Sequence, residues 1–175
     1  MCLANLRPQK DHLNLLKAFK RIQYSYLDWT LHLVGLDVQD NYSKEIKEYI
    51  ILNKLSNHVF LYGSCNDTAH ILKQATIGVL ASKSEGLPVA LLEYGLAKLS
   101  VVVTDVGECA SVVTHERSGM VVAPKNEKVL SEGIKKLMEN ENLRLRYSES
   151  LHSTIQMKYS KSNFMQTLIA IYNLD

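Results

Sequence analysis

The sequence predicts an α/β fold, because short apolar runs typical of β-strands alternate with segments of helical periodicity along most of the chain. The helical segments have roughly ten to fifteen residues, the length expected of right-handed crossovers between parallel strands. This alternation indicates a Rossmann-like, doubly wound parallel sheet of about six strands, with helices on both faces. The length of 175 residues, without an internal repeat or linker, favours a single domain over residues 1–175 that ends in helices.

The individual elements follow from apolar runs and helix signals. The predicted strands are Leu3–Leu6, Thr30–Val34, Val59–Tyr62, Ile77–Ala81, Ser100–Thr104 and Met120–Val122. The first predicted helix carries an apolar stripe of Leu15, Ala18, Phe19 and Ile22 and has Asp11 as its N-cap. The other predicted helices are Ser43–Leu55, Thr68–Gln74, Pro88–Lys98 and most of the chain after Asn126. Near the C-terminus, Met165, Leu168, Ile169 and Tyr172 share one helical face, which we expect to pack on the sheet or on another domain.

Composition and charge argue against several classes of protein. Lys and Arg number 20 against 18 Asp and Glu, without a block of like charge, so no nucleic-acid-binding surface is expected. No apolar run reaches the roughly 18 residues of a membrane-spanning helix, and the cysteine pattern favours a reducing compartment, so we expect a cytoplasmic protein, with peripheral contact to a membrane left open. Three cysteines without a C-x-x-C pair and six scattered histidines predict neither a disulfide framework nor a metal site. Each histidine is expected to be exposed or hydrogen-bonded in the core.

The loop after the fourth predicted strand carries the clearest functional signal. In a doubly wound sheet, ligands bind outside the carboxyl ends of the strands. The loop Ser82–Pro88 starts at that edge and leads into a helix, with Pro88 expected at the first helical position and Gly86 allowing close approach of the backbone. The free amides and the positive dipole end of such a helix bind anions, and phosphate is the natural occupant.

Two carboxylates lie on either side of this predicted anion site. Glu85 precedes the helix, and Glu93 lies five residues beyond Pro88, which is about 7.5 Å along the axis at about 1.5 Å per residue. That separation is close to the length of a diphosphate. Ionised carboxylates only accept hydrogen bonds, so they fit hydroxyl groups on either side of the anion. A nucleotide-sugar has this layout, but two solvated glutamates on an ordinary helix would show the same spacing.

The segment Ser84–Glu93 resembles the E-x7-E signature of retaining glycosyltransferases of family 4, within the glycosyl transferases group 1, which have the GT-B fold. The similarity continues in order along nearly the whole chain. It includes Asn5–His12, Leu33–Gly35, Val59–Gly63, Val101–Gly107 and Ser118–Val122. The chain therefore resembles the C-terminal, donor-binding half of such an enzyme, and the resemblance does not extend to the N-terminal acceptor domain, which is absent from this sequence.

The resemblance implies a role for each matching residue. Glu85 would hold hydroxyls of the donor sugar and Lys10 would stabilise the departing diphosphate, so these two are the expected catalytic residues. Glu93 would hold the ribose diol. The other expected donor contacts are Gly86, Leu87 and Pro88 through their backbone, Arg7 as a second cation, and Gly63 and Ser64 beside the nucleobase.

Four positions depart from the family pattern. Asn5 stands where an arginine often joins the lysine on the diphosphate, which is why Arg7 is considered for that role. Lys98 replaces a helix-ending glycine, Ser111 replaces a frequent glutamate, and Tyr94 begins a segment that differs from the small residues usual after the second glutamate. If Lys98 must adopt a left-handed conformation, that costs about 1 kcal/mol.

The activity that the resemblance implies is transfer of a hexosyl group from a UDP- or GDP-linked sugar to a hydroxyl acceptor. The anomeric configuration would be retained, and the product would belong to polysaccharide, capsule or glycolipid synthesis. No metal and no cofactor besides the sugar donor is expected. Two alternatives stay open from the sequence: a non-catalytic regulatory or assembly module that retains the fold, and a GT-B relative such as a nucleotide-sugar epimerase.

Overall fold

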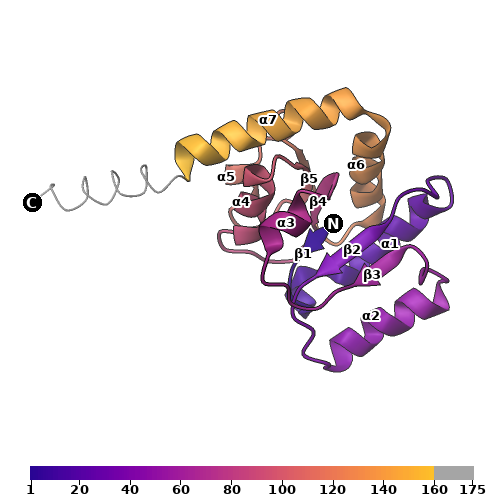
Figure 1. Cartoon of the computed structure of the whole chain (residues 1–175). Helices are drawn as coiled ribbons and strands as arrows, with labels where there is room; N and C mark the ends of the chain where they lie inside the picture. Colours follow the sequence, from indigo (N-terminus) through magenta and orange to yellow (C-terminus); the bar gives the residue numbers. More distant parts are fainter. Residues whose placement is uncertain (160–175) are drawn as a thin grey trace, which may run out of the picture.

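The computed structural model describes residues 1–159, so the predicted stripe of Met165, Leu168, Ile169 and Tyr172 lies outside the described residues. Parallel strands form two three-stranded ladders in the orders β1-β2-β3 and β4-β5-β6 (Figure 1). The strands are β1 Cys2–Leu3, β2 Leu31–Val34, β3 Val59–Leu61, β4 Ile77–Leu80, β5 Ser100–Thr104 and β6 Met120–Val122. The fifth and sixth strands have the predicted bounds.

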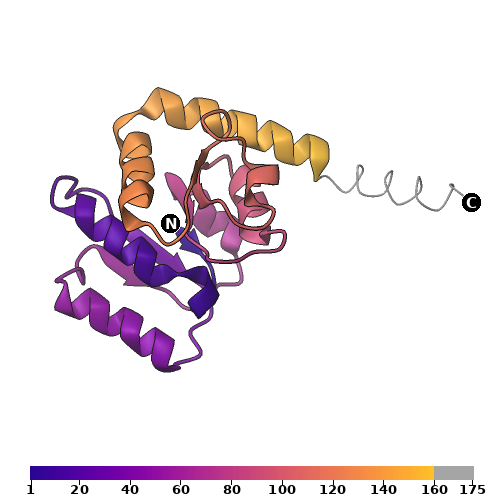
Figure 2. The ribbon, with the colours of Figure 1, turned by 180° about the vertical axis from the view of Figure 1, so that it is seen from behind.

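Helices lie on both faces of these strands. They are η1 Pro8–Lys10, α1 His12–Gln23, α2 Asn41–Leu52, α3 Thr68–Leu72, α4 Val89–Leu96, α5 Cys109–Val112, α6 Glu127–Glu139 and α7 Glu141–Lys158, where η1 is a 3-10 helix. Helix α1 contacts α2 and α6 in one layer, while α4 contacts α3 and α7, and α7 contacts α5, in a second layer. Figures 1 and 2 show these two groups from opposite sides. The predicted doubly wound α/β architecture is confirmed.

The central strand β5 supplies both faces of the core. Val102 is completely buried in one hydrophobic cluster, which includes residues of α1 and α6. Its neighbours Val101 and Val103 are completely buried in a second cluster, with residues of α4 and α7. Successive side chains of a strand point to opposite faces, so this uninterrupted apolar run is what a strand covered on both sides requires.

The two ladders meet between β1 and β4. The ammonium nitrogen of Met1 donates a hydrogen bond to the carbonyl of Ile77 at 2.7 Å, and the carbonyl of Met1 accepts one from the Val79 amide at 2.8 Å. The Leu3 amide does not pair with β4 and donates to the hydroxyl of Tyr94 at 2.7 Å. The spatial order of the strands is therefore 3-2-1-4-5-6, as in dinucleotide-binding folds, with a side chain inserted where the six-stranded ladder would otherwise continue.

The first predicted strand is longer than the one observed. Leu3–Leu6 was expected to be extended, whereas β1 ends at Leu3. The pairing nevertheless continues, because the amides of Ala4 and Leu6 donate to the carbonyls of Val34 and Leu36, each at 2.9 Å. Thus the chain remains beside β2 until the turn at Pro8 begins.

Some helix boundaries differ from the prediction for local reasons. Helix α2 begins at Asn41, because the Asp40 carboxylate accepts a hydrogen bond from the Ser43 amide at 2.9 Å and caps the helix there. Pro88 is the N-cap of α4, with an extended ψ of 103°, and is not its first helical residue. Helices η1 and α5 were not predicted, because three or four residues are too few to show a helical period.

None of the helices in residues 1–159 is both long enough and apolar enough to span a bilayer. A cytoplasmic location remains a prediction from the sequence.

Candidate functional site

The candidate site is built from loops at the carboxyl edge of the strands. The turn η1 follows β1, the loop of Gly63 follows β3, the loop 82–88 follows β4, and the segment 105–108 follows β5. All strands are parallel, so their carboxyl ends share one edge, and residues far apart in the sequence meet there.

The two expected catalytic residues contact each other directly. The Lys10 ammonium donates hydrogen bonds to both oxygens of the Glu85 carboxylate, at 2.7 and 2.8 Å. The side chain of Glu85 is only 7% exposed and that of Lys10 is 23% exposed. The Ser82 hydroxyl donates a further hydrogen bond to Glu85 at 2.5 Å. The carboxylate is thus held in one orientation at the base of the loop, with a cation beside it.

A second set of contacts joins the same two loops. The Lys83 amide donates to the carbonyl of Gln9 at 2.7 Å, and the Lys83 ammonium lies 3.1 Å from the buried carboxylate of Asp11. Asp11 has a left-handed φ of 50° and precedes α1, but its side chain accepts no capping hydrogen bond. The prediction that Asp11 is the N-cap of α1 is therefore confirmed, although its carboxylate forms the ion pair with Lys83 and does not cap the helix.

The segment after β5 supports the loop from its other side. Gly107 has a φ of +51°, and a Cβ atom placed there would lie 1.9 Å from the carbonyl oxygen of Glu85. The neighbouring Glu108 amide donates to the carbonyl of Gly86 at 3.2 Å. The Thr104 hydroxyl donates to the carbonyl of Ser82 at 2.7 Å. Only glycine fits at position 107, and the backbone of the Glu85 loop is fixed from both sides.

The loop ends at the open N-terminus of α4. Pro88 is buried and gives the helix no side-chain cap, whereas Gly86 and Leu87 are exposed. The Leu91 amide donates to the carbonyl of Pro88 at 2.9 Å, so the Val89 and Ala90 amides are the first-turn donors without an acceptor, and they lie at the positive end of the helix dipole. Glu85 and the exposed backbone of Gly86 therefore lie next to a group of donors suited to an anion.

Glu93 lies farther along α4 and is half-buried. Its Oε1 atom accepts a hydrogen bond from the hydroxyl of Thr68, the first residue of α3, at 3.0 Å. The predicted helix Thr68–Gln74 includes Thr68, but no role for this residue was apparent from the sequence. The signal available was the preceding Asp67, whose carboxylate accepts from the His70 amide at 3.0 Å and fixes the start of α3 at Thr68.

Gly63 and Ser64, the residues expected beside a nucleobase, form an open part of the edge. Gly63 has a φ of +69°, its carbonyl accepts from the Gly35 amide at 2.8 Å, and no atom lies within 4 Å of an added Cβ. Ser64 is exposed. The conformation of the backbone at Gly63 is thus fixed while its surroundings are free to receive a ligand.

Arg7 is not brought to the Lys10–Glu85 pair by any contact. It is exposed, precedes η1, and forms no ion pair within residues 1–159. Asn5 stands at the position where the family pattern often has an arginine. Its amide oxygen accepts a hydrogen bond from the Leu36 amide at 2.8 Å. In this chain that position holds the loop after β2 rather than offering a cation to the site.

Cys109 lies close to the site, but its thiol is unreactive near neutral pH. It begins α5 and is completely buried. Burial raises the pKa of its thiol to about 11, and the nearby Glu85 carboxylate acts in the same direction. The thiol therefore stays protonated near neutral pH and is a poor nucleophile.

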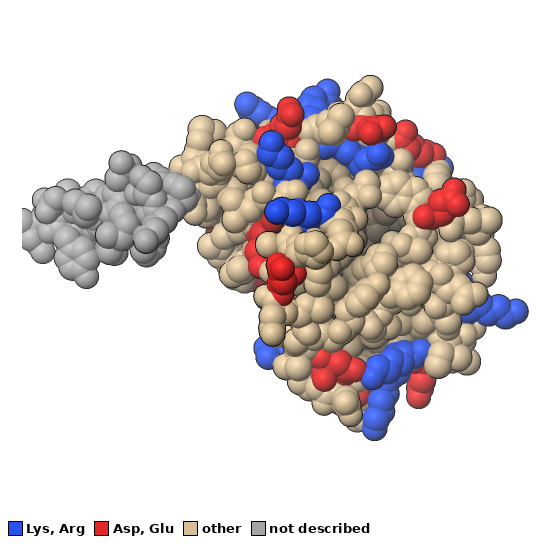
Figure 3. Space-filling model, viewed as in Figure 1, with Lys and Arg blue, Asp and Glu red and all other residues tan. Residues whose placement is uncertain are grey.

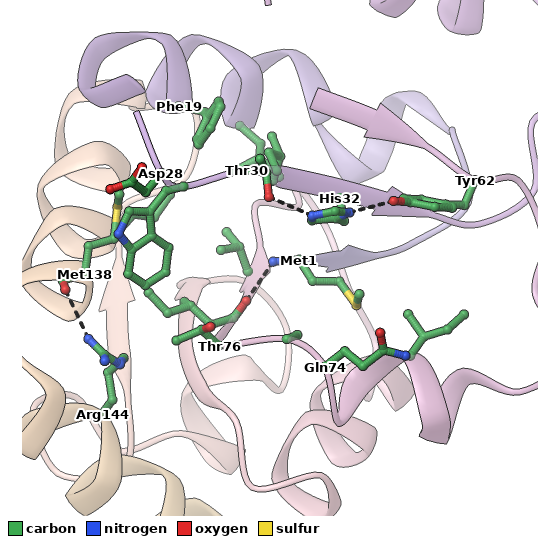
Figure 4. A pocket seen from close by; sticks show the side chains of 18 residues that line it. Met1, Phe19, Asp28, Thr30, His32, Tyr62, Gln74, Thr76, Met138 and Arg144 are labelled. Atoms are coloured by element: carbon green, nitrogen blue, oxygen red, sulfur yellow. Dashed lines mark hydrogen bonds between the residues drawn. The ribbon is translucent and has the colours of Figure 1, made fainter. Parts of the chain in front are cut away.

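A cavity of about 580 Å³ lies at the opposite edge of the strands (Figure 4). Its lining includes Trp29 and Thr30, which precede β2, and Thr76, which precedes β4. On one wall the His32 ring is hydrogen-bonded to the hydroxyls of Thr30 and Tyr62, at 2.8 and 2.9 Å. Figure 3 shows a recess bounded mostly by uncharged residues, with basic and acidic side chains mixed around it. None of the predicted site residues lines this cavity.

Comparison with known proteins gives the relationships of the chain. It is 30% identical, over 118 residues, to the N,N'-diacetylbacillosaminyl-diphospho-undecaprenol alpha-1,3-N-acetylgalactosaminyltransferase of Campylobacter jejuni, covering 67% of this chain and 31% of that enzyme. The structure of Alr3699/HepE from Anabaena in complex with UDP superimposes with a TM-score of 0.93 at 19% identity, covering 99% of this chain and 48% of that one.

A third similar structure is an isolated domain. The C-terminal domain of the group 1 glycosyl transferase LpcC from Francisella tularensis superimposes with a TM-score of 0.83 at 22% identity, covering 91% of this chain and 85% of that one. By contrast, the chain spans about half the length of the curated relatives it matches, or less.

A family model described as glycosyl transferases group 1 matches residues 1–152, which include every residue of the candidate site. The chain therefore belongs to the glycosyl transferases group 1 family.

Proposed function

We propose that this chain is the nucleotide-sugar-binding domain of a retaining glycosyltransferase of family 4. The observation that carries the proposal is the meeting of Lys10 and Glu85 beside the open N-terminus of α4, with Glu93 farther along the same helix. This arrangement offers a cation and free amides to a diphosphate, with one carboxylate on each side for hydroxyl groups. The similar structure from Anabaena, which contains UDP, supports this assignment.

Each side chain has a distinct task in this proposal. Lys10 and the first amides of α4 bind the diphosphate and stabilise the charge that develops as it departs. Glu85 accepts hydrogen bonds from hydroxyls of the sugar, and Glu93 accepts them from the ribose diol. The backbone of Gly86, Leu87 and Pro88 contacts the sugar and phosphates. Because Lys10 and Glu85 are paired with each other, the donor must exchange part of this ion pair for its own contacts.

The reaction of the whole enzyme would be transfer of a hexosyl group from a UDP- or GDP-linked donor to a hydroxyl acceptor, with retention at the anomeric carbon. A second, N-terminal domain would bind the acceptor, which agrees with the length of the relatives. The protein would act mainly by positioning both substrates and stabilising the leaving group, without a further cofactor. Any contact with a membrane would belong to the full enzyme.

The proposal is tested by calorimetric titration of the chain with UDP- and GDP-linked hexoses. We expect one of the two nucleotide classes to bind and to raise the melting temperature. Lys10→Met and Glu93→Gln should each weaken binding about tenfold or more, because each removes a charged partner of the ligand. Lys17→Met, which changes an exposed lysine of α1, is the matched control and should bind like the unmodified chain.

The same titration distinguishes the alternative of a non-catalytic regulatory or assembly module. Such a module would bind neither class of nucleotide-sugar at millimolar concentration, and Lys10→Met would have no effect on its ligands. That result would contradict the proposed function.

A further inference from the structure

We propose that Thr68 is a positioning residue for the Glu93 carboxylate, so that a hydroxyl outside the E-x7-E segment determines how well the chain binds a ribose. The inference rests on the proposed function, because it concerns the nucleotide part of the same donor. The Thr68–Glu93 contact lies between α3 and α4 and joins residues 25 positions apart in the sequence.

The geometry of Thr68 is fixed independently of Glu93. Thr68 begins α3 because the Asp67 carboxylate caps this helix at the His70 amide. At the other end of the helix, Leu72 is 1% exposed and packs in the same hydrophobic cluster as Leu91 of α4. The helix is therefore anchored at both ends, and the Thr68 hydroxyl is presented to α4 by a rigid support.

The hydrogen bond selects one arrangement of the Glu93 side chain. Within residues 1–159, Thr68 is the one side chain that donates a hydrogen bond to Glu93. Without that donor, the half-buried carboxylate would be free to change rotamer, and a ligand would have to order it at an entropic cost. With the donor in place, one lone pair of Oε1 is used. The second lone pair of Oε1 and both of Oε2 stay available to the two hydroxyls of a diol.

The position of α3 extends this role to the nucleobase side of the site. Helix α3 begins four residues after Ser64, at the end of the loop that starts at Gly63. The backbone expected beside the base and the hydroxyl that orients the ribose carboxylate therefore belong to one short segment. A ligand that contacts the loop also stabilises the support of Glu93.

The test compares nucleotides that differ in a single hydroxyl. The chain and its Thr68→Val and Thr68→Ser variants are titrated by calorimetry with UDP and 2′-deoxy-UDP, and with GDP and 2′-deoxy-GDP. In the unmodified chain we expect the ribonucleotide to bind about tenfold better than its deoxy form, as expected for a lost hydrogen bond to a charged group. Thr68→Val should weaken ribonucleotide binding about three- to tenfold and deoxynucleotide binding much less.

Loss of discrimination is the decisive readout. Thr68→Ser, which keeps the hydroxyl, should preserve the ratio between the two nucleotides. In the Glu93→Gln background, Thr68→Val should add little, because its effect acts through Glu93. Equal weakening of both nucleotides by Thr68→Val, or no change in either, would overturn the inference while leaving the proposed function intact.

Two further results remain distinguishable from these. If the unmodified chain binds neither UDP nor GDP, the proposed function fails and this inference fails with it. Thermal melting of each variant checks its folding, and Thr68→Ala replaces Thr68→Val if the valine variant does not fold. The alanine variant is expected to show the same loss of discrimination, and a retained ratio in it would count against the role of Thr68.

Discussion

The imidazole of His12 is completely buried at the start of α1, and neither ring nitrogen has a hydrogen-bond partner of normal geometry within residues 1–159. Burial lowers the pKa of His12 to about 4, and the nearby Lys10 acts in the same direction. The carbonyl of Ala4 and the carboxylate of Asp11 oppose this shift. The ring is therefore neutral in the folded protein near neutral pH, because burial of its charged form costs more than the Ala4 carbonyl and the Asp11 carboxylate return.

The pH dependence of stability should reveal this group. Because the pKa of His12 falls from 6.5 to about 4 on folding, the unfolded chain takes up a proton first as the pH decreases. The contribution of His12 is then complete above pH 6.5 and is lost progressively down to about pH 4, by roughly 3 kcal/mol in total. Urea denaturation at intervals between pH 7 and pH 4 measures this loss.

The control is His12→Leu, which removes the titrating ring from an apolar site. Its stability should decrease less than that of the unmodified chain over the same pH range, because it lacks the ring that the unfolded chain protonates first. Parallel pH profiles for the two proteins would show that His12 does not titrate as described.

The prediction that every histidine is exposed or hydrogen-bonded is wrong for His12. The helical period of α1 places His12 at the first turn, but burial of its ring depends on Ala4 and Tyr42, which come from other elements. Such contacts between distant segments have no signature in a single sequence. The same limit applies to the ion pair of Asp11 with Lys83, which joins the N-cap of α1 to the loop after β4.

At the scale of elements, the end of α4 is a helix stop built without glycine. The Leu99 amide donates to the carbonyl of Tyr94 at 2.9 Å, and the Lys98 amide donates to that of Gly95 at 3.2 Å. These are the two hydrogen bonds of a Schellman motif, in which the residue after the C-cap, here Lys98, is left-handed. Lys98 has a φ of 56°, so this position is left-handed, which is the condition under which the cost of about 1 kcal/mol arises.

Replacing Lys98 by glycine should therefore stabilise the protein. Glycine adopts a positive φ without the steric cost that a Cβ atom brings, so Lys98→Gly is expected to gain about 1 kcal/mol and to raise the melting temperature by about 2–4 °C. Lys73→Gly is the control, because Lys73 ends α3 in a right-handed conformation with a φ of −62°. That substitution should give no gain, and an equal gain at both positions would contradict the explanation.

Tyr94, at one of the positions that depart from the family pattern, connects α4 with two strands. Its hydroxyl accepts from the Leu3 amide of β1 and donates to the Val79 carbonyl of β4, at 2.7 and 3.4 Å. Burial raises the pKa of this hydroxyl well above its usual range, so it remains a donor. The ring also fills the space beside Gly78, where an added Cβ would lie 2.7 Å from it. A helix residue thus joins the two ladders of the sheet.

At the scale of the whole molecule, the order of elements and the edge that carries the site were predictable from the sequence. Apolar runs separated by helices identify a parallel sheet, and the resemblance around Glu85 and Glu93 identifies the edge. The pairing of Lys10 with Glu85 and the hydrogen bond from Thr68 to Glu93 were not predictable, because both arise only when separate loops converge. The support from Gly107 has the same origin.

Within residues 1–159, the two edges of the strands differ in what they offer a ligand. The carboxyl edge carries the proposed donor site, and the amino edge carries the cavity lined by Trp29 and Thr76. Only the first combines a cation, the N-terminus of a helix of eight residues and two carboxylates. A nucleotide-sugar should therefore bind at the carboxyl edge and leave the cavity unaffected.

The most direct test is a nuclear magnetic resonance titration of the isotope-labelled chain with the UDP- or GDP-linked hexose that binds in calorimetry. We expect the amide signals of Gly63, Ser64, Gly86 and Leu87 to shift together with one dissociation constant. The indole signal of Trp29 and the amide signal of Thr76 should stay unchanged. Shifts confined to Trp29 and Thr76, or no shifts at millimolar ligand, would contradict the account.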